Sequence, residues 1–307
     1  MRIALWADME GMSRVVDHRQ CWPAFEEYWT EGRHAFTDEV VAAATGLIDG
    51  GAHEVYVVNA HGLGWPNLLW DELPDGAAPA DDRAYTEGFD AAFQVGFHAR
   101  AGTPGAFMSH TMVPGLKVAA DGAPLTECHI WAWLDELPLL GVSGDAALGD
   151  QIDGFLAGTP FVAVKHATGR GAATPLHPER TASLAALTDF ARGTVRSPTR
   201  PLDLPSEFTF EVALEPHLAD QAEGQAGLTR RSPEVLGKRA QIFARDAYPA
   251  LQAAMGAALQ PLFAAQGDLD LSSEAVMQRQ DKHALARCRD FFDDWAQVSE
   301  PAWPKQE

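Results

Sequence analysis

Cysteine is scarce in this chain of 307 residues, which contains only Cys21, Cys128 and Cys288. The three cysteines are far apart in the sequence and odd in number. Neither a disulfide framework nor a CxxC metal-binding motif is therefore expected, and all three should be reduced thiols.

Basic residues and long hydrophobic runs are also lacking. The chain has 23 Lys and Arg against 43 Asp and Glu, a net charge of −20, which argues against a nucleic-acid partner because phosphate contacts need cationic side chains. No apolar run approaches the roughly 18 residues of a membrane helix, and the start of the chain lacks the features of a signal peptide. We therefore expect a cytoplasmic protein without a membrane partner.

Short apolar runs bounded by turn residues predict buried strands at 3–7, 54–58 and 92–97. A helical pattern at 31–48 separates the first two and ends at a Gly-Gly pair, Gly50-Gly51, typical of a helix C-terminus. The order strand, helix, strand is typical of a parallel sheet.

The pattern continues along the chain with further predicted elements. These are strands at 137–142 and 160–164, helices at 146–156 and 178–192, a proline-rich linker at 194–205, a strand at 208–214, a turn or short helix at 222–228, a helix at 246–263 and an amphipathic helix within the last forty residues. The predicted fold class is α/β, with a mostly parallel central sheet flanked by helices and a smaller C-terminal α+β portion. We expect a metal-binding catalytic domain at 1–196 and a smaller domain with a helical tail at 206–307.

Side chains able to bind metal follow each of the first three predicted strands. Asp8 and Glu10 are two residues apart at the end of the first strand, so they point to the same face. His61 follows the second strand and His98 the third. Each alone is more often structural or solvated, but the carboxyl ends of parallel strands meet at one edge, where ligands bind. A mixed histidine and carboxylate site there suits Zn²⁺, with Mn²⁺ or Ni²⁺ as alternatives.

Several of these segments resemble one known family. The motifs 8–11 (DMEG), 59–61 (NAH), 96–105 (GFHARAGTPG) and 108–112 (MSHTM) are similar to those of the DppA family of zinc-dependent D-aminopeptidases. The resemblance extends from the first residue to about residue 175 and continues weakly to about residue 260.

The resemblance implies two zinc ions per subunit. In that family an aspartate bridges the ions, and the matching residue here is Asp8. Glu10 and His98 match the other ligands of one ion, whereas His61 and Glu127 match those of the second. Without the resemblance, Glu127 is more simply the acidic residue of a helix start.

His110 matches the family's catalytic histidine, and three roles for it remain open: a nucleophile, a proton carrier or a group that stabilises the oxyanion. The implied reaction is attack of a metal-activated water on a short peptide or amino acid amide, releasing an amino-terminal residue, expected to be a small D-residue. The alternatives are an L-aminopeptidase, a binuclear amidase or lactamase, a phosphoesterase, and a non-catalytic metal-stabilised assembly protein.

The chain departs from the family pattern at Asn59 and Phe97, in a loop at 105–108 that is one residue longer, and in a tail after about residue 265 without a recognised counterpart. The resemblance also implies a ring-like homo-oligomer, a decamer being one option.

Other residues near the motifs are weaker candidates. Trp65 and Trp70 are candidates for a substrate wall or a subunit contact, whereas packing is the expected role of Trp131 and Trp133. We leave three charged side chains outside the predicted site: Lys165 and His166 as surface charges, and Arg100 as a loop anchor.

Overall fold

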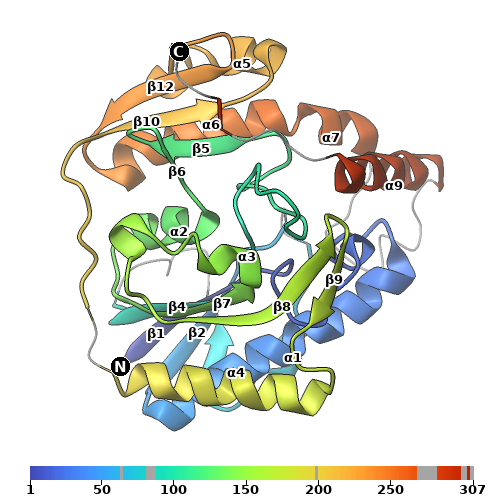
Figure 1. Cartoon of the computed structure of the whole chain (residues 1–307), viewed down its shortest axis with the longest axis vertical. Coiled ribbons are helices and arrows are strands. Elements are labelled where there is room, and N and C mark those ends of the chain that lie inside the picture. The colour runs from blue at the N-terminus through green and yellow to red at the C-terminus, as the bar shows by residue number, and fades with distance from the viewer. Residues whose placement is uncertain (63–64, 81–87, 198–199, 268–281, 299–302, 305–307) are drawn as a thin grey trace.

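The computed structural model describes the whole chain except residues 63–64, 81–87, 198–199, 268–281, 299–302 and 305–307. Its largest element is a seven-stranded sheet in the order β3-β2-β1-β4-β7-β8-β9, parallel except for β9 (Figure 1). The strands are β1 (Arg2–Ala7), β2 (Glu54–Asn59), β3 (Ala77–Pro79), β4 (Ala91–Phe97), β7 (Leu139–Asp145), β8 (Phe161–Gly169) and β9 (Ala172–Pro175). The predicted α/β class with a mostly parallel central sheet is confirmed.

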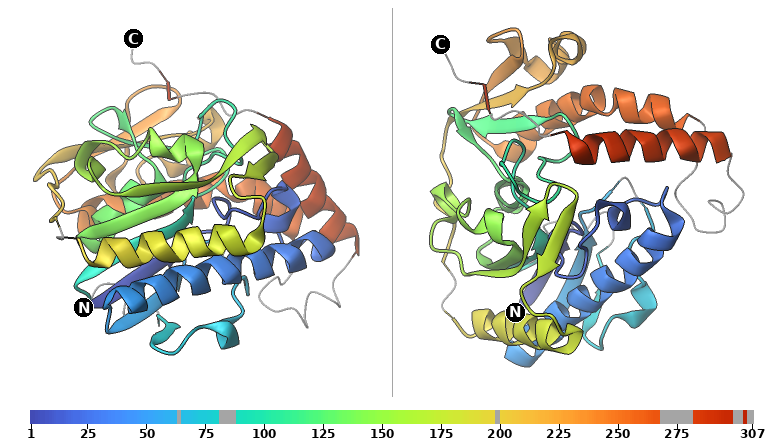
Figure 2. Two further views of the ribbon diagram at one scale, coloured as in Figure 1. Left: turned by 60° about the horizontal axis from the view of Figure 1, so that its bottom comes forward. Right: turned by 45° about the vertical axis from the view of Figure 1, so that its right-hand side comes forward.

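Helices cover both faces of this sheet, which explains why its central strands are apolar throughout rather than alternating. On one face lie α1 (Glu26–Gly50) and α4 (Arg180–Val195), which pack against each other and against the sheet (Figure 2). Helix α1 begins five residues before the predicted start and ends at Gly51, whose φ of 115° provides a left-handed C-cap.

The opposite face carries α2 (Glu127–Asp135) and α3 (Ala146–Gly149). The predicted helix at 146–156 is wrong in its length, because α3 ends after one turn and a separate 3-10 turn follows at Gly154–Leu156. Asp153, extended at φ −123° and ψ −167°, separates the two segments.

A second, antiparallel sheet has the order β11-β12-β10-β5-β6. Its strands are β5 (Lys117–Ala120), β6 (Ala123–Pro124), β10 (Phe208–Ala213), β11 (Thr229–Arg230) and β12 (Val235–Ala240). The hairpin of β5 and β6 comes from the first half of the chain but pairs with strands from the second half. The division into domains at 1–196 and 206–307 stays a prediction.

The C-terminal part is mainly helical. It contains α5 (Pro216–Ala222), a π-helical turn (Phe243–Ala247), α6 (Tyr248–Ala258), α7 (Gln260–Gln266) and α9 (Lys282–Gln297). The predicted helix at 246–263 is divided at Leu259, because Pro261 lacks the N–H that would continue the helix. The predicted C-terminal helix is confirmed as α9, which lies along α7 (Figure 2).

Further short 3-10 helices lie at His18–Cys21, Trp70–Glu72 and Gln225–Gly227. All three cysteines are buried free thiols, as predicted. Within the described residues, none of the helices has the length and apolar character needed to cross a membrane.

Candidate active site

A close backbone contact brings the loop after β1 to the end of β4. The N–H of Gly11 donates to the carbonyl of Gly96 at 2.7 Å. A Cβ atom at Gly11 would lie 1.9 Å from the Phe97 carbonyl oxygen, so only glycine fits at this position. The contact places the carboxylate of Asp8 beside the imidazole of His98.

The four residues predicted from strand ends meet at one edge of the sheet, as the parallel topology requires. The Nδ1 atom of His61 lies 2.9 Å from Glu10 Oε2 and 3.5 Å from Asp8 Oδ1. His98 Nε2 lies 3.3 Å from Asp8 Oδ2. All four side chains are at least 97% buried.

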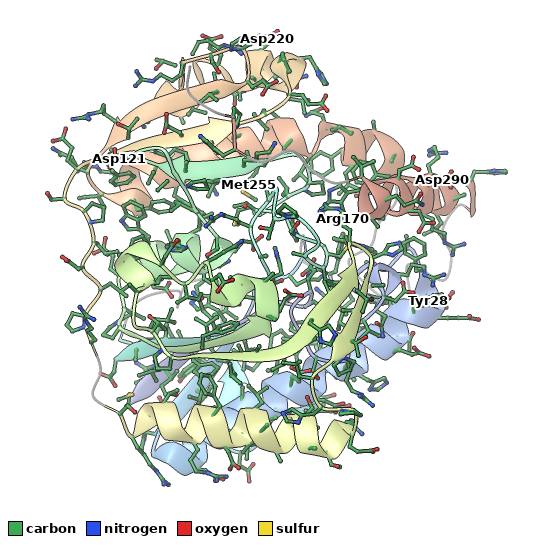
Figure 3. All side chains as sticks on the ribbon, viewed as in Figure 1. Tyr28, Asp121, Arg170, Asp220, Met255 and Asp290 are labelled. Atoms are coloured by element: carbon green, nitrogen blue, oxygen red, sulfur yellow. The ribbon has the colours of Figure 1, made fainter. Side chains whose placement is uncertain are left out.

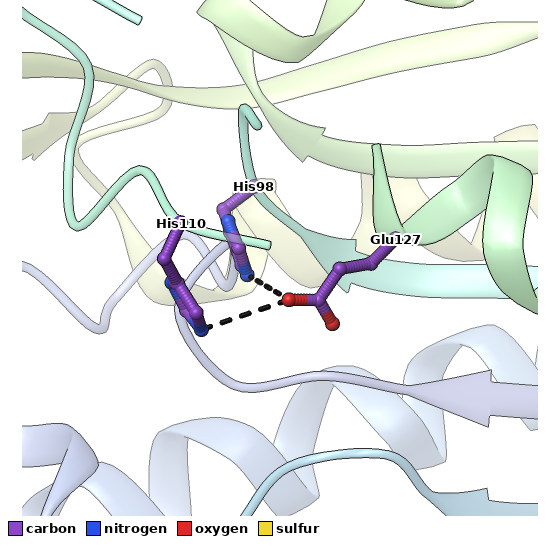
Figure 4. A group of neighbouring side chains, drawn as sticks. All are labelled: His98, His110 and Glu127. Atoms are coloured by element: carbon purple, nitrogen blue, oxygen red, sulfur yellow. Dashed lines mark ion pairs between the residues drawn. The ribbon is translucent and has the colours of Figure 1, made fainter. Parts of the chain in front are cut away.

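Glu127 and His110 join the same cluster from another part of the chain (Figure 4). Glu127 is the first residue of α2, after the N-cap Thr126, and its Oε1 accepts the N–H of Met112. This oxygen lies 3.4 Å from His98 Nε2 and 3.6 Å from His110 Nε2. The rings of His98 and His110 are stacked with centroids 4.0 Å apart. Glu127 is therefore both a helix-start residue and a member of the site.

Two groups of side chains in the cluster present possible metal ligands within 4.8 Å of one another, namely Asp8 with Glu10 and His98, and His98 with His110 and Glu127. The first group matches a predicted ligand set. His61 belongs to neither group, and its Nε2 lies 2.8 Å from the carbonyl of Cys21. The assignment of His61 and Glu127 to a common ion stays a prediction.

The residues present fit a bound cation. Asp8 Oδ2 and His98 Nε2 are buried and have no hydrogen-bond partner, although buried polar atoms are rarely left without one. Both are good ligand atoms for Zn²⁺. A metal ion between them would satisfy both.

The pKa values of the clustered side chains also favour a bound cation. Burial raises the pKa of Asp8, and the charge of Glu10 raises it further. Burial alone would also raise the pKa of Glu10, but the charge of His61 outweighs it and lowers that pKa to about 2. For His98, burial is outweighed by the nearby Glu127 carboxylate and by the charges of Asp8 and Glu10, which raise the pKa to about 10. The carboxylates thus attract positive charge, which metal ions would supply in exchange for the histidine protons.

His110 is neutral, in contrast to the protonated His98. Burial lowers its pKa to about 3, and the neighbouring charge of His98 acts in the same direction. Its Nδ1 lies 2.7 Å from the carbonyl of Met108, and because a carbonyl only accepts, Nδ1 must carry the proton. The Nε2 atom of the neutral ring then presents a lone pair to the cluster.

The loop that carries His110 is held in a restricted backbone conformation. Met108 and Met112, two residues to either side, have φ values of +44° and +67°. Such values cost free energy in residues other than glycine and persist only where surrounding contacts enforce them. Arg170 provides such contacts, because Nη1 donates to the Ser109 carbonyl at 3.0 Å and the Arg170 carbonyl accepts the Met108 N–H at 2.7 Å.

The expectation that Lys165 is a surface charge is wrong. This residue of β8 is fully buried, and its amine donates to the carbonyls of Glu10 and Val15 and lies over the ring of Phe107. Burial lowers its pKa to about 8. Lys165 thus anchors the loop that carries the predicted ligands Asp8 and Glu10. The sequence gives no sign of this role, because Lys165 and its partners are some 150 residues apart in the chain.

The other two charged candidates are placed as predicted. Arg100 Nη1 donates to the carbonyl of Pro124 at 3.3 Å and so anchors a loop, and His166 is exposed.

A cavity of about 530 Å³ opens at the cluster, and its polar lining includes Asp8, Glu10, His61, His110 and Glu127. Trp65 lines it, as predicted for a substrate wall, whereas Trp70 is 38% exposed and lies outside. Trp131 lines the cavity too, and its ring also packs on Trp6. Trp133 is a core residue packed against Phe155, Phe208 and Phe243.

The fold and this site define a class of protein: the chain belongs to the D-aminopeptidase family, peptidase family M55, whose model matches residues 1–253. A curated D-aminopeptidase of Bacillus subtilis (strain 168) is 28% identical over 196 residues, 60% of this chain and 70% of that protein. A solved structure, described as the Zn-dependent D-aminopeptidase DppA from Bacillus subtilis, a self-compartmentalizing protease, superposes with a TM-score of 0.75. It is 24% identical, and the match covers 85% of this chain and 98% of that one.

Family membership confirms the resemblance predicted from the motifs, and with it the class of enzyme, an aminopeptidase. The alternatives of a phosphoesterase, an amidase or lactamase, an L-aminopeptidase and a non-catalytic assembly protein are not favoured.

Proposed function

We propose that this protein is a zinc-dependent D-aminopeptidase that releases the amino-terminal residue from short peptides or amino acid amides. One observation carries the proposal: in a chain of the D-aminopeptidase family, three carboxylates and three histidines converge in a buried cluster with two unpartnered ligand atoms. The zinc dependence stated for the structural relative supports the choice of metal.

Two zinc ions are proposed, with Mn²⁺ or Ni²⁺ as substitutes of similar ligand preference. Asp8 would bridge the ions, Glu10 and His98 would complete one site, and His61 and Glu127 the other. When bound, the metals would polarise the amide carbonyl and lower the pKa of a water molecule.

We assign His110 the role of proton carrier among the three that the sequence leaves open. Its Nδ1 proton is committed to the Met108 carbonyl, so Nε2 is free to take a proton from water and return it to the leaving amine. Aromatic rings limit the access of solvent to the cluster, since Trp22 and Trp65 lie with their ring centroids 5.5 and 5.8 Å from that of His61. Excluding water strengthens the electrostatic interactions of the site.

The proposal is tested by metal analysis together with an assay of D- and L-alaninamide and of D-alanyl p-nitroanilide. We expect about two zinc ions per chain and faster release from the D-isomers. Zinc-loaded protein that cleaves no aminoacyl amide of either configuration would refute the peptidase assignment, and cleavage of the L-isomers alone would refute the D-preference.

We also propose a ring-like homo-oligomer, with a decamer as one option. The support is the description of the structural relative as self-compartmentalizing. Light scattering of the purified protein tests this, and a monomer would reject it. The cytoplasmic location stays a prediction.

A further inference from the structure

We infer that the part of the chain after residue 253, together with apolar residues of the earlier part, makes the active-site cavity selective for an amino-terminal residue with a bulky apolar side chain, followed by an uncharged leaving group. This inference rests on the proposed aminopeptidase function and specifies its substrate class. It concerns a segment that the family model does not cover.

Part of the apolar wall of the cavity comes from this segment. Met255 on α6, Leu259 at the end of α6, Leu262 on α7 and Phe292 on α9 all line the cavity that contains the predicted metal ligands. Met255 lies on the side of α6 that faces the seven-stranded sheet (Figure 3). Residues of the three helices α6, α7 and α9 therefore line the same cavity as the cluster.

Helix α9 is attached directly to the active site. Phe292 stacks on Trp22 with centroids 4.1 Å apart, and Trp22 in turn contacts His61. The ring of Trp295 meets the ring of His110 edge-on at 5.2 Å, and the Trp295 carbonyl accepts from Arg170 at 3.1 Å. These contacts fix the position of α9 relative to the catalytic groups.

The opposite wall is aromatic as well. Trp6 and Trp131 line the cavity and stack with centroids 4.5 Å apart. At about 530 Å³ the cavity can hold a large side chain in addition to the reacting part of a small substrate, and most of its surface is apolar. A large apolar side chain would fill this space and leave water, which favours its binding.

The charge of the lining argues against a carboxylate on the substrate beside the scissile bond. Among the described residues that line the cavity, none is Lys or Arg, whereas Asp8, Glu10 and Glu127 are acidic. Away from the proposed metal ions, a carboxylate buried here would lack a cationic partner. An amide or an extended peptide leaving group avoids this cost.

The amino-terminal side chain is the group that enters the apolar part of the cavity. Aminopeptidase chemistry requires the free amine and the scissile carbonyl to lie at the cluster. The amine nitrogen and the carbonyl carbon are both bonded to Cα, which also carries the side chain. The first atom of the side chain is therefore only two bonds from the amine nitrogen. The side chain thus extends from the cluster into the adjoining apolar space.

The first test compares kcat/KM of the zinc-loaded protein for D-alaninamide, D-leucinamide and D-phenylalaninamide. We expect the two bulky amides to exceed D-alaninamide by about tenfold or more, as filling an apolar pocket typically gives. Equal or faster turnover of D-alaninamide would overturn the inference while leaving the proposed function intact. Turnover of none of the amides would instead refute the proposed function.

The second test uses two neighbours on α7. Leu262 is buried and lines the cavity, whereas the adjacent Phe263 is 44% exposed and lies outside it. Leu262→Lys is expected to reduce the ratio of D-phenylalaninamide to D-alaninamide kcat/KM by about tenfold. Phe263→Lys, the matched control, should leave this ratio as in the wild type.

A third variant covers the case in which a buried lysine prevents folding. Met255 is only partly buried, and Met255→Trp should narrow the cavity without introducing charge. We expect the same ratio to fall at least threefold, at an unchanged zinc content and circular dichroism spectrum. An unchanged ratio in folded, zinc-loaded Met255→Trp would contradict the assignment of the wall.

Discussion

The active-site cavity is built from two regions of contrasting chemistry. The ends of β1, β2 and β4 and the start of α2 supply carboxylates and histidines from the part of the chain that the family model covers. Helices α6, α7 and α9 supply methionine, leucine and phenylalanine from residues after 253. The bond-breaking groups all come from the part that the family model covers, whereas the apolar lining combines residues of that part, such as Trp6 and Trp131, with residues after 253. The apolar residues after 253 can therefore change without a change in the bond-breaking groups.

The strongest test of the polar region is Asp8→Asn. Asparagine cannot bridge two cations as a carboxylate does, so zinc binding and activity should be lost together. We expect kcat/KM to fall by on the order of a thousandfold, since bound metal contributes several kcal/mol of transition-state stabilisation. Metal analysis and amide hydrolysis are measured on the same sample. The control is Asp75→Asn, at an exposed turn, and full zinc content with full activity in Asp8→Asn would exclude the bridging role.

His110→Ala should separate proton transfer from metal binding. If Nε2 carries protons, kcat should fall by about 100-fold to 10,000-fold while most of the zinc is retained. Loss of zinc in this variant would instead identify His110 as a ligand, which its distance to the Glu127 carboxylate also permits. His166→Ala, on the exposed part of β8, is the control for removal of an imidazole.

Lys165→Met should weaken zinc binding without removing any predicted metal ligand. The amine fixes the loop through the Glu10 carbonyl, so its loss should raise the Kd for zinc by about tenfold to 100-fold, the range found for groups that orient metal ligands. Competition with a chelator measures this Kd. Arg239→Met, the control, removes an exposed cation that pairs with Glu207 on the antiparallel sheet, and it should leave the Kd near the wild-type value.

Much of the polar region was predictable from the sequence, and the reason is geometric. In a parallel sheet the residues that follow adjacent strands must meet, so Asp8, Glu10, His61 and His98 could be placed together before the structure was known. Glu127 and His110 lie on a helix start and a loop, which no strand periodicity connects to the sheet. Only their motifs indicated them.

The apolar region was not predictable, because its composition is that of any core helix. Leu259 and Leu262 have the spacing of residues that pack inside a protein, and nothing local distinguishes a leucine facing a cavity from one facing other side chains. The break at Pro261, which orients the two leucines, depends on which helix follows it. The role of Lys165 likewise arises from a contact across the fold.

A buried carboxylate outside the cavity, Asp135 at the end of α2, offers the last and smallest test of the difference between apolar and polar surroundings. Asp135 is 6% exposed and bonds only to the indole N–H of Trp6 among the described residues, and its Oδ1 has no partner. Burial raises its pKa to about 8, despite the hydrogen bond from Trp6, whereas Glu10, surrounded by histidines, has a pKa of about 2. The same type of group is thus neutral in one region and charged in the other.

The pH dependence of stability follows from this shift. Between the unfolded pKa of about 3.8 and the folded pKa of about 8, the folded state binds a proton that the unfolded state does not, so stability falls as the pH rises through this window. Asp135→Asn replaces the titrating carboxyl with a neutral amide, so this contribution to the pH dependence disappears. The free energy of unfolding of this variant should exceed that of the wild type by about 2 kcal/mol at pH 9, and this excess should shrink towards pH 5. Urea unfolding at both pH values, at constant zinc, measures the difference, with Asp75→Asn expected to show none. An excess that is the same at both pH values would mean that Asp135 is charged in the folded state, and that its surroundings are more hydrated than its burial indicates.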